Sequence, residues 1–262
     1  MKKIIINVLK ISGLYNFLLR RKRMMNQRKA EKIEQENYQR RMVFYSTFIS
    51  KGDLIFDVGA NVGNRTDNFL KLGASVVAVE PQPQCIQILT QKYGDKITLE
   101  PVGLGSTPGE MEMFIADEST ISTFSKDFID KTKDNKFKRN SWEQKLKVKI
   151  ITIDELIKKH GSPDFCKMDV EGFETEVLKG LSSPIKKLSF EYNVPEMAEN
   201  ICQNIAILKR LSNNYIFNYC IGESMHLELA DWKHADDFMQ IVKSPAFLNS
   251  DFGDIYAFIK TS

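Results

Sequence analysis

The residues best suited to chemistry begin with a glycine-bearing loop that reads Asp57-Val58-Gly59-Ala60-Asn61-Val62-Gly63. The loop follows the apolar run 54–58 and precedes an amphipathic run, so we expect it to join a buried strand to a helix. Glycine has no Cβ, and the backbone here can therefore turn tightly and come close to a ligand. In open α/β sheets a ligand lies at the carboxyl ends of the strands, where this loop is expected.

A second acidic residue adds to this pattern. Glu80 ends the apolar run 75–79, which predicts the second strand of the sheet. A carboxylate there suits hydrogen bonds from both hydroxyls of a ribose, each worth about 1.5–3 kcal/mol. The fingerprint of nicotinamide-dependent oxidoreductases needs glycine where this chain has Asn61, which disfavours a pyrophosphate site. A tight structural turn beside a solvated glutamate is the alternative to a nucleoside site.

Two further carboxylates follow another apolar run, 165–170. Strand alternation would put Asp169 and Glu171 on one side, facing the same crevice as the loop. Such a pair can share a proton, which would raise one pKa toward a useful value, or orient a hydroxyl group. The alternative is structural, with Asp169 capping the next helix and Glu171 complementing its dipole. We expect Lys167 to point to the opposite face and assign it no chemistry.

Glu191, near the end of the following strand, is a third candidate for the substrate pocket. The three carboxylates could supply oxygen ligands, but the sequence shows no further recognisable ligand, and we predict that no metal takes part. Zinc is also not expected, because no cysteines form a C-x-x-C pair and no histidines have helical ligand spacing. The four scattered cysteines suit a cytoplasmic protein with reduced thiols.

Strand and helix signals alternate from Lys51 onward, which predicts a doubly wound α/β domain with a mostly parallel sheet. The runs 111–115 and 146–150 look like strands beyond the core sheet. The expected core strands are 54–58, 75–79, 97–102, 165–170, 188–192, 215–220, 225–229 and 255–259. The expected helices are 63–72, 83–93, 152–159, 172–178 and 196–212.

The chain of 262 residues divides into a basic helical extension, 1–50, and one domain, 51–262. The extension holds 12 Lys/Arg and 3 Asp/Glu, a net charge of +9, whereas the domain holds 25 and 31, a net charge of −6. A nucleic-acid footprint over the domain is therefore not expected. The apolar stretch 4–19 is too short and polar to span a bilayer. Residues 1–30 are interpreted either as a helix on an anionic membrane surface or as a helix packed on the domain.

Residues 117–149 form a long polar segment without strong periodicity, which predicts an active-site flap or an irregular insertion. From Lys126 to Lys149 it carries nine Lys/Arg against four Asp/Glu, so it could attract an anionic glycan, although a solvated surface is the simpler explanation. Its aromatic residues either stack on a sugar ring or anchor the flap to the core: Phe124, Phe128, Phe137 and Trp142.

Together, residues 57–66, Val79-Glu80-Pro81 and residues 167–174 resemble the FkbM-type methyltransferases. The resemblance covers about residues 50–195 well and the rest more loosely. It implies a class I fold with about seven strands and S-adenosylmethionine as the cofactor. It also implies O-methylation of a hydroxyl on a sugar, glycan or natural product.

The resemblance also implies roles for particular residues. By the resemblance, Glu80 would hold the ribose. From their place at the end of the apolar run 165–170, and not from the resemblance, we expect Asp169 to be the acceptor-side carboxylate or weak base and Glu171 to orient the substrate or the loop. The cofactor-binding set would be Asp57, Gly59, Asn61, Gly63, Glu80, Gly103 and Leu104. An amine or carboxylate acceptor, or a nucleoside-binding module without turnover, remain the alternatives. The oligomeric state is left open.

Overall fold

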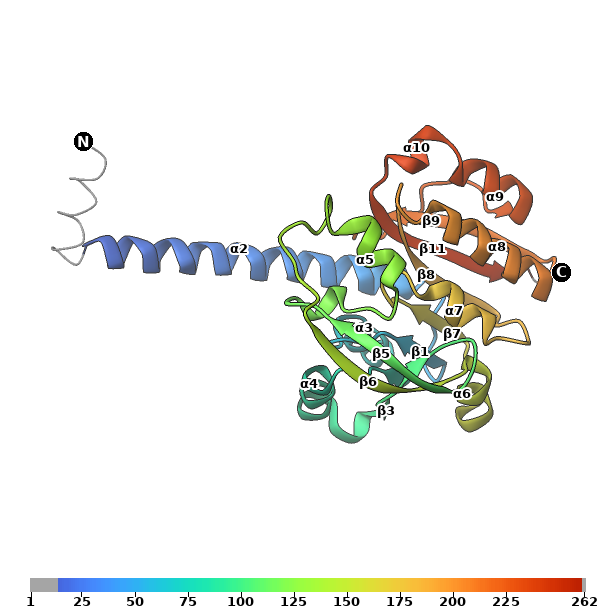
Figure 1. Ribbon diagram of the computed structural model, residues 1–262, viewed down its shortest axis with the longest axis horizontal. Coiled ribbons are helices and arrows are strands. Elements are labelled where there is room, and N and C mark those ends of the chain that lie inside the picture. The colour runs from blue at the N-terminus through green and yellow to red at the C-terminus, as the bar shows by residue number, and fades with distance from the viewer. Residues whose placement is uncertain (1–13, 261–262) are drawn as a thin grey trace.

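The structure is a computed structural model that describes residues 14–260. An eight-stranded sheet has the strand order β10-β9-β11-β8-β7-β1-β2-β3 (Figure 1). Its parallel part consists of β1 (Leu54–Val58), β2 (Ser75–Val79), β3 (Ile97–Glu100), β7 (Phe165–Met168) and β8 (Lys187–Asn193). The antiparallel part consists of β9 (Tyr215–Ile221), β10 (Lys233–His234) and β11 (Phe252–Ile259). The predicted doubly wound α/β fold is confirmed.

Helices cover both faces of this sheet, and two apolar clusters form the core. The end of α2 (Leu14–Tyr45), with α3 (Asn64–Lys71) and α4 (Pro83–Tyr93), packs on one face. The helices of the other cluster are α6 (Ile153–His160), α7 (Glu174–Lys179), α8 (Ala198–Leu211), α9 (Ala235–Val242) and α10 (Pro245–Leu248). Both faces of the strands are buried, which explains why they read as continuous apolar runs in the sequence.

A smaller sheet lies beside the large one. It has the order β4-β6-β5, formed by β4 (Gly103–Leu104), β5 (Gly109–Ile115) and β6 (Gln144–Ile151). The segment predicted as a flap, 117–149, therefore ends in a strand. Before β6 it contains the short 3₁₀ helix η2 (Ser119–Ile121) and helix α5 (Lys126–Thr132). Another 3₁₀ turn, η1 (Gly94–Lys96), precedes β3.

The predicted strand 225–229 is wrong. Met225 has a left-handed backbone with φ 51°, which an extended strand does not allow. The Asn218 side chain also bonds both the N–H and the C=O of Leu229, so a side chain replaces part of a strand ladder. The chain pairs with β9 only later, through β10.

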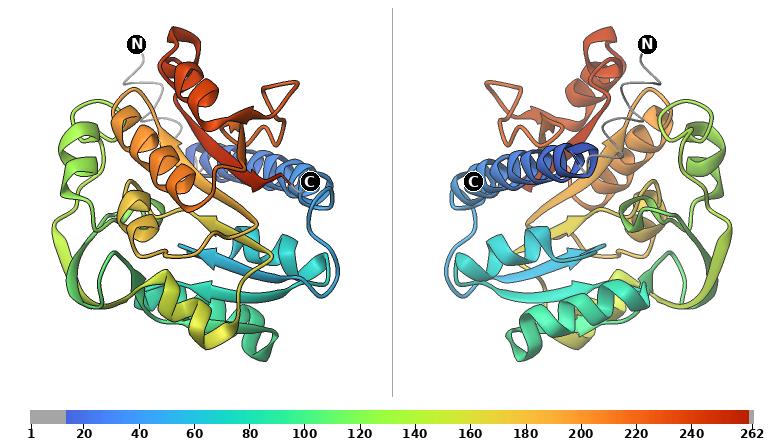
Figure 2. Two further views of the ribbon diagram at one scale, coloured as in Figure 1. Left: turned by 90° about the vertical axis from the view of Figure 1, so that its right-hand side faces the viewer. Right: turned by 90° about the vertical axis from the view of Figure 1, so that its left-hand side faces the viewer.

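The N-terminal helix meets the domain only near its end. Tyr45 is fully buried, and the Arg41 guanidinium bonds the Asn68 side chain of α3 at 3.0 Å. The first part of α2 projects away from the body of the molecule (Figures 1 and 2). No helix within residues 14–260 is long and apolar enough to cross a membrane.

Candidate active site

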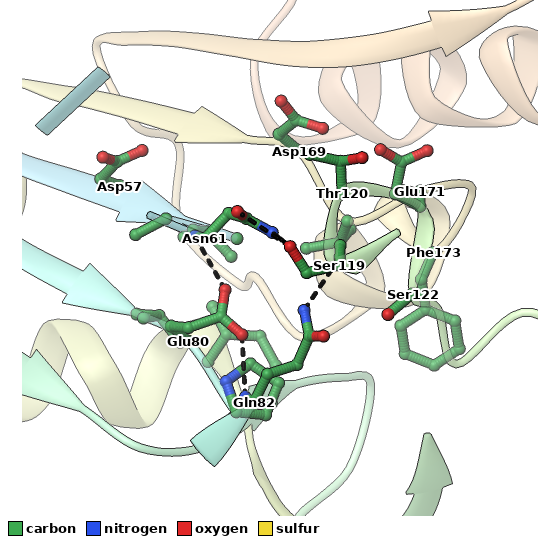
Figure 3. A pocket seen from close by; sticks show the side chains of 18 of the residues that line it. Asp57, Asn61, Glu80, Gln82, Ser119, Thr120, Ser122, Asp169, Glu171 and Phe173 are labelled. Carbon is green, nitrogen blue, oxygen red and sulfur yellow. Dashed lines mark hydrogen bonds between the residues drawn. The ribbon is translucent and has the colours of Figure 1, made fainter. Parts of the chain in front are cut away.

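A cavity of about 240 Å³ lies at the carboxyl ends of β1, β2 and β7 (Figure 3). Open parallel sheets bind their ligands at this edge. The cavity brings together most of the residues singled out in the sequence, namely Asp57, Gly59, Asn61, Glu80, Gly103, Leu104, Asp169 and Glu171. Residues that are far apart in the chain therefore face one common space.

Glu80 is fixed by the backbone around it. Its two carboxylate oxygens accept the backbone N–H groups of Asn61 and Gln82, both at 2.8 Å. Burial raises the pKa of Glu80 to about 7, although these hydrogen bonds favour the ionised form. A carboxylate oxygen can accept two hydrogen bonds, so each oxygen keeps a free lone pair. The carboxylate is therefore oriented and still able to accept two hydroxyl groups.

The loop owes its shape to Gly59 and Asn61. Gly59 has φ 79°, and a Cβ there would lie 1.8 Å from the Asp169 carbonyl oxygen, so only glycine fits. Asn61 has φ 48°, a conformation that asparagine tolerates better than most residues. Asp57 is buried beneath the loop and accepts the Thr66 hydroxyl at 2.5 Å. Burial raises the pKa of Asp57.

Gly63 does not line the cavity, in contrast to the role that the resemblance implied. It precedes α3 with φ 83°, and a Cβ there would lie 2.6 Å from the ring of Tyr93. The Tyr93 hydroxyl also donates to the Gly63 carbonyl at 2.7 Å. Glycine at this position is explained by helix entry and packing.

The side of the cavity that lies opposite Asp57 is apolar. Gly103 and Leu104 line it together with Phe124 and Phe173, whose ring centroids are 5.4 Å apart. A Cβ at Gly103 would lie 2.8 Å from the Phe124 ring and would narrow the space. Flat apolar walls of this kind suit an adenine ring.

Three carboxylates gather across the cavity from Glu80. Oxygens of Asp169, Glu171 and Glu191 lie within 4.8 Å of one another, a spacing that could also hold a cation. Burial and the neighbouring acids, Asp169 first among them, raise the pKa of Glu171 well above its ordinary value. Burial and Glu171 do the same for Glu191, which lines a small adjoining cavity with Glu174. Ionisation of all three carboxylates at once is therefore unfavourable.

Strand alternation does not explain the position of Glu171 in the cluster. Its φ of 53° is in the left-handed region, which is uncommon for a residue other than glycine. The turn places its carboxylate near Asp169 (Figure 3). Strained backbone of this kind persists where the surrounding structure holds it, often at functional sites.

Our expectation for Lys167 is wrong. Its ammonium group bonds Asp169 at 3.0 Å and Asp254 of β11 at 3.2 Å, and it lines the cavity. The backbone N–H of Asp169 bonds Val58, so extended pairing continues past the end of β7. Residues 167 and 169 therefore share a face, as alternation requires. Although burial alone would lower the pKa of Lys167, the two aspartates hold it well above its ordinary value.

The segment before β6 covers the cavity. Ser119 contacts Asn61 through its hydroxyl at 3.3 Å and accepts the Gln82 side chain at its carbonyl at 3.1 Å. The Thr123 hydroxyl donates to the Glu171 carbonyl at 2.7 Å. The aromatic residues mostly anchor this segment, since Phe128 is fully buried and packs on Phe137.

Several residues that line the cavity were not predicted to do so: Asn64, Arg65, Gln82, Met113, Ser119, Thr120, Ser122, Phe173 and Glu223. Phe124, which we expected either to stack on a sugar ring or to anchor the flap, also lines it. Gln82 could have been found from its place two residues after Glu80, and Arg65 from its place in the loop motif. Glu223 gave no local signal, because it comes from the irregular segment after β9.

A family model described as a methyltransferase FkbM domain matches residues 57–259. This chain belongs to that family. It is therefore an S-adenosylmethionine-dependent methyltransferase domain. The resemblance seen in the motifs is confirmed, and the match extends it to the end of β11.

A curated relative shares part of this domain. The hexuronic acid methyltransferase AglP of Haloferax volcanii is 31% identical over 144 residues, which are 53% of this chain and 54% of that protein. The chain thus matches about half the length of this relative.

Solved methyltransferase structures are more distant. Precorrin-6y C5,15-methyltransferase from Geobacter metallireducens is 10% identical with a TM-score of 0.42, covering 84% of this chain and 87% of that one. A TehB-like methyltransferase from Corynebacterium glutamicum is 10% identical with a TM-score of 0.43, covering 84% and 88%. The family assignment rests on the match over residues 57–259.

The cavity fits S-adenosylmethionine in its chemistry. Glu80 presents an oriented carboxylate with two free lone pairs, as a ribose diol requires. Asp57 and Phe173 lie on opposite sides of the pocket, with Asn61 and Glu80 between them (Figure 3). One end is therefore polar and the other apolar, which matches a ligand that joins an amino-acid group to a purine.

Proposed function

We propose that this protein methylates a hydroxyl group of a sugar or glycan, with S-adenosylmethionine as the donor. The observation that carries the proposal is the carboxylate cluster across the cavity from Glu80. Carboxylates can orient a hydroxyl group and accept its proton. The name of the relative, a hexuronic acid methyltransferase, supports a sugar as the acceptor class.

When bound, S-adenosylmethionine supplies an electrophilic methyl group that needs no further activation. The chain must then hold the acceptor oxygen about 3–3.5 Å from the methyl carbon, in line with the carbon–sulfur bond. The acceptor oxygen donates an electron pair to that carbon, while the electrons of the carbon–sulfur bond remain on sulfur. The hydroxyl proton is left to a carboxylate of the cluster.

The contacts of Asp169 and Glu171 support a division of roles opposite to the one inferred from the sequence. Asp169 is bonded to the Lys167 ammonium, which fixes its carboxylate in place, as a group that orients a hydroxyl should be. Burial and the neighbouring acids raise the pKa of Glu171, so its carboxylate accepts a proton more readily than an ordinary glutamate does. We assign proton acceptance to Glu171 and orientation to Asp169.

The test is a panel of neutral sugars, uronic acids, amino sugars and glycans incubated with donor carrying a trideuterated methyl group. Mass spectrometry should find a labelled product whose methyl group survives mild alkali, as a methyl ether does. A label lost in alkali would identify a carboxylate acceptor, and a label on nitrogen an amine acceptor, and either result would overturn the hydroxyl assignment. Glu171→Gln should form the labelled product about 100-fold more slowly or worse.

We also propose that the projecting part of α2 contacts an anionic membrane surface. Residues 1–30 contain nine Lys/Arg and no Asp/Glu, and Met24 and Met25 are 55% and 63% exposed. Basic segments with apolar side chains bind anionic lipid surfaces. Deleting residues 1–30 should remove association with vesicles containing phosphatidylserine while cofactor binding stays unchanged. Equal association of both proteins at low salt would contradict this proposal.

A further inference from the structure

Arg65 occupies the polar end of the cofactor cavity. It lies in the first turn of α3, lines the cavity, and keeps only 13% of its side chain exposed. Among residues 14–260 its guanidinium has one hydrogen-bond partner, Glu223, at 2.6 Å, and its Nε–H has none. A guanidinium offers five N–H donors, so most of its capacity remains free.

Glu223 links Arg65 to the N-terminal helix. Its other carboxylate oxygen lies 3.5 Å from the guanidinium of Arg41, which is 3% exposed and also bonds Asn68. Arg65 is thus held from α3, from the segment after β9 and, through Glu223, from α2. Arg41 lies outside residues 57–259, the part that the family model matches.

The charges at this end of the cavity match an α-amino acid. Arg65 supplies a cation with free donors, and the Asp57 carboxylate lines the same cavity. A carboxylate ligand pairs with guanidinium in a directional, charge-assisted way, and an ammonium ligand pairs with a carboxylate. Glu80 lies between this end and the apolar wall, where the ribose would be (Figure 3).

We propose that Arg65 binds the α-carboxylate of the cofactor's methionine group, and that Glu223 and Arg41 position it. The proposal rests on S-adenosylmethionine as the cofactor and is independent of the acceptor. It makes the N-terminal helix part of the cofactor site, although this helix lies outside the matched domain.

Two ligands that differ only at the amino-acid end provide the test. S-adenosylhomocysteine carries the carboxylate, whereas 5′-methylthioadenosine has the same nucleoside without it. By calorimetry, Arg65→Met should weaken binding of S-adenosylhomocysteine ten-fold or more and change binding of methylthioadenosine less than two-fold. Arg65→Lys, which keeps the charge, should recover part of the loss.

The positioning role has its own variants. Arg41→Met should weaken the binding of S-adenosylhomocysteine, by a smaller factor than Arg65→Met does, and should leave the binding of methylthioadenosine unchanged. Arg41→Lys should restore the affinity for S-adenosylhomocysteine. As a matched control, Glu80→Ala should weaken both ligands, because both carry a ribose. If Arg65→Met weakens the binding of both ligands equally, the role of Arg65 is structural and the proposal is overturned. If the unchanged protein binds neither ligand, the cofactor assignment fails and this proposal fails with it.

Discussion

The two sides of the cavity hold carboxylates in different ways. On one side, which we expect to hold the ribose and call the ribose side, both oxygens of Glu80 accept backbone N–H groups from the loops that follow β1 and β2. On the other side, where we propose that the acceptor binds and which we call the acceptor side, three carboxylates lie within 4.8 Å of one another, and the side-chain ammonium of Lys167 bonds one of them. One side is arranged by the backbone, and the other by opposing charges.

This difference suits two tasks. Backbone donors fix the Glu80 carboxylate before a ligand arrives, which favours binding because little ordering remains to be done. Crowded, partly buried carboxylates have raised pKa values and accept protons more readily. The ribose side should therefore govern affinity and the acceptor side turnover.

Glu171→Gln should give the largest effect. Removing a general base lowers the rate typically by 10²–10⁴-fold, and we expect a loss of about 100-fold or more in kcat. Affinity for S-adenosylhomocysteine should change less than about two-fold, because this residue lies away from the ribose. Glu199→Gln on the exposed face of α8 is the control and should behave like the unchanged enzyme. Equal losses in kcat and in affinity for Glu171→Gln would contradict the view that the acceptor side governs turnover and the ribose side governs affinity.

Glu80→Ala should have the converse effect. Losing hydrogen bonds to an ionised carboxylate costs about 1.5–3 kcal/mol, or roughly ten-fold or more in affinity for S-adenosylhomocysteine by calorimetry. At saturating donor, kcat should fall much less than in Glu171→Gln. Glu110→Ala on β5 is an exposed control. Unchanged affinity in Glu80→Ala would contradict the ribose assignment.

The pKa of Glu80, raised by burial to about 7, predicts a smaller effect of pH on binding. Ribose hydroxyls donate to the ionised carboxylate, so binding favours that form and releases protons below the pKa. Affinity for S-adenosylhomocysteine should therefore fall as pH drops from 8 to 6, by up to about ten-fold for a single group. Glu80→Gln cannot titrate at this position and should flatten the profile. A profile that stays steep in this variant would assign the titration to another group.

The ribose side was largely predictable from the sequence because it is local. The loop 57–63 and Glu80 follow neighbouring parallel strands, and the carboxyl ends of such strands share one edge of the sheet. The glycine and carboxylate pattern therefore fixes both the fold and the meeting of these groups. Their contact appears as the hydrogen bond from Asn61 to Glu80.

The acceptor side was only partly predictable because its electrostatics are long-range. Asp254, which bonds Lys167, lies 87 positions away in the sequence and has no recognisable motif. Lys167 was misplaced although alternation gives its face, and α5 was missed because polar residues 117–143 show no clear period. A left-handed backbone conformation places Glu171, and a glutamate in the sequence does not predict such a conformation.

Removal of divalent cations by a chelator should have the smallest effect of all, because we expect no change in turnover. The carboxylate cluster has the right spacing for a cation, but Lys167 already supplies a buried positive charge to Asp169. A raised pKa allows Glu191 to take up a proton, which lowers the remaining negative charge without a metal and leaves Glu171 free to act as the base. Turnover after EDTA treatment should match the untreated enzyme, and added Mg²⁺ or Mn²⁺ should not raise it. Loss of turnover that Mg²⁺ restores would place a cation among the three carboxylates, and Glu171 would then act as a ligand, not as the base.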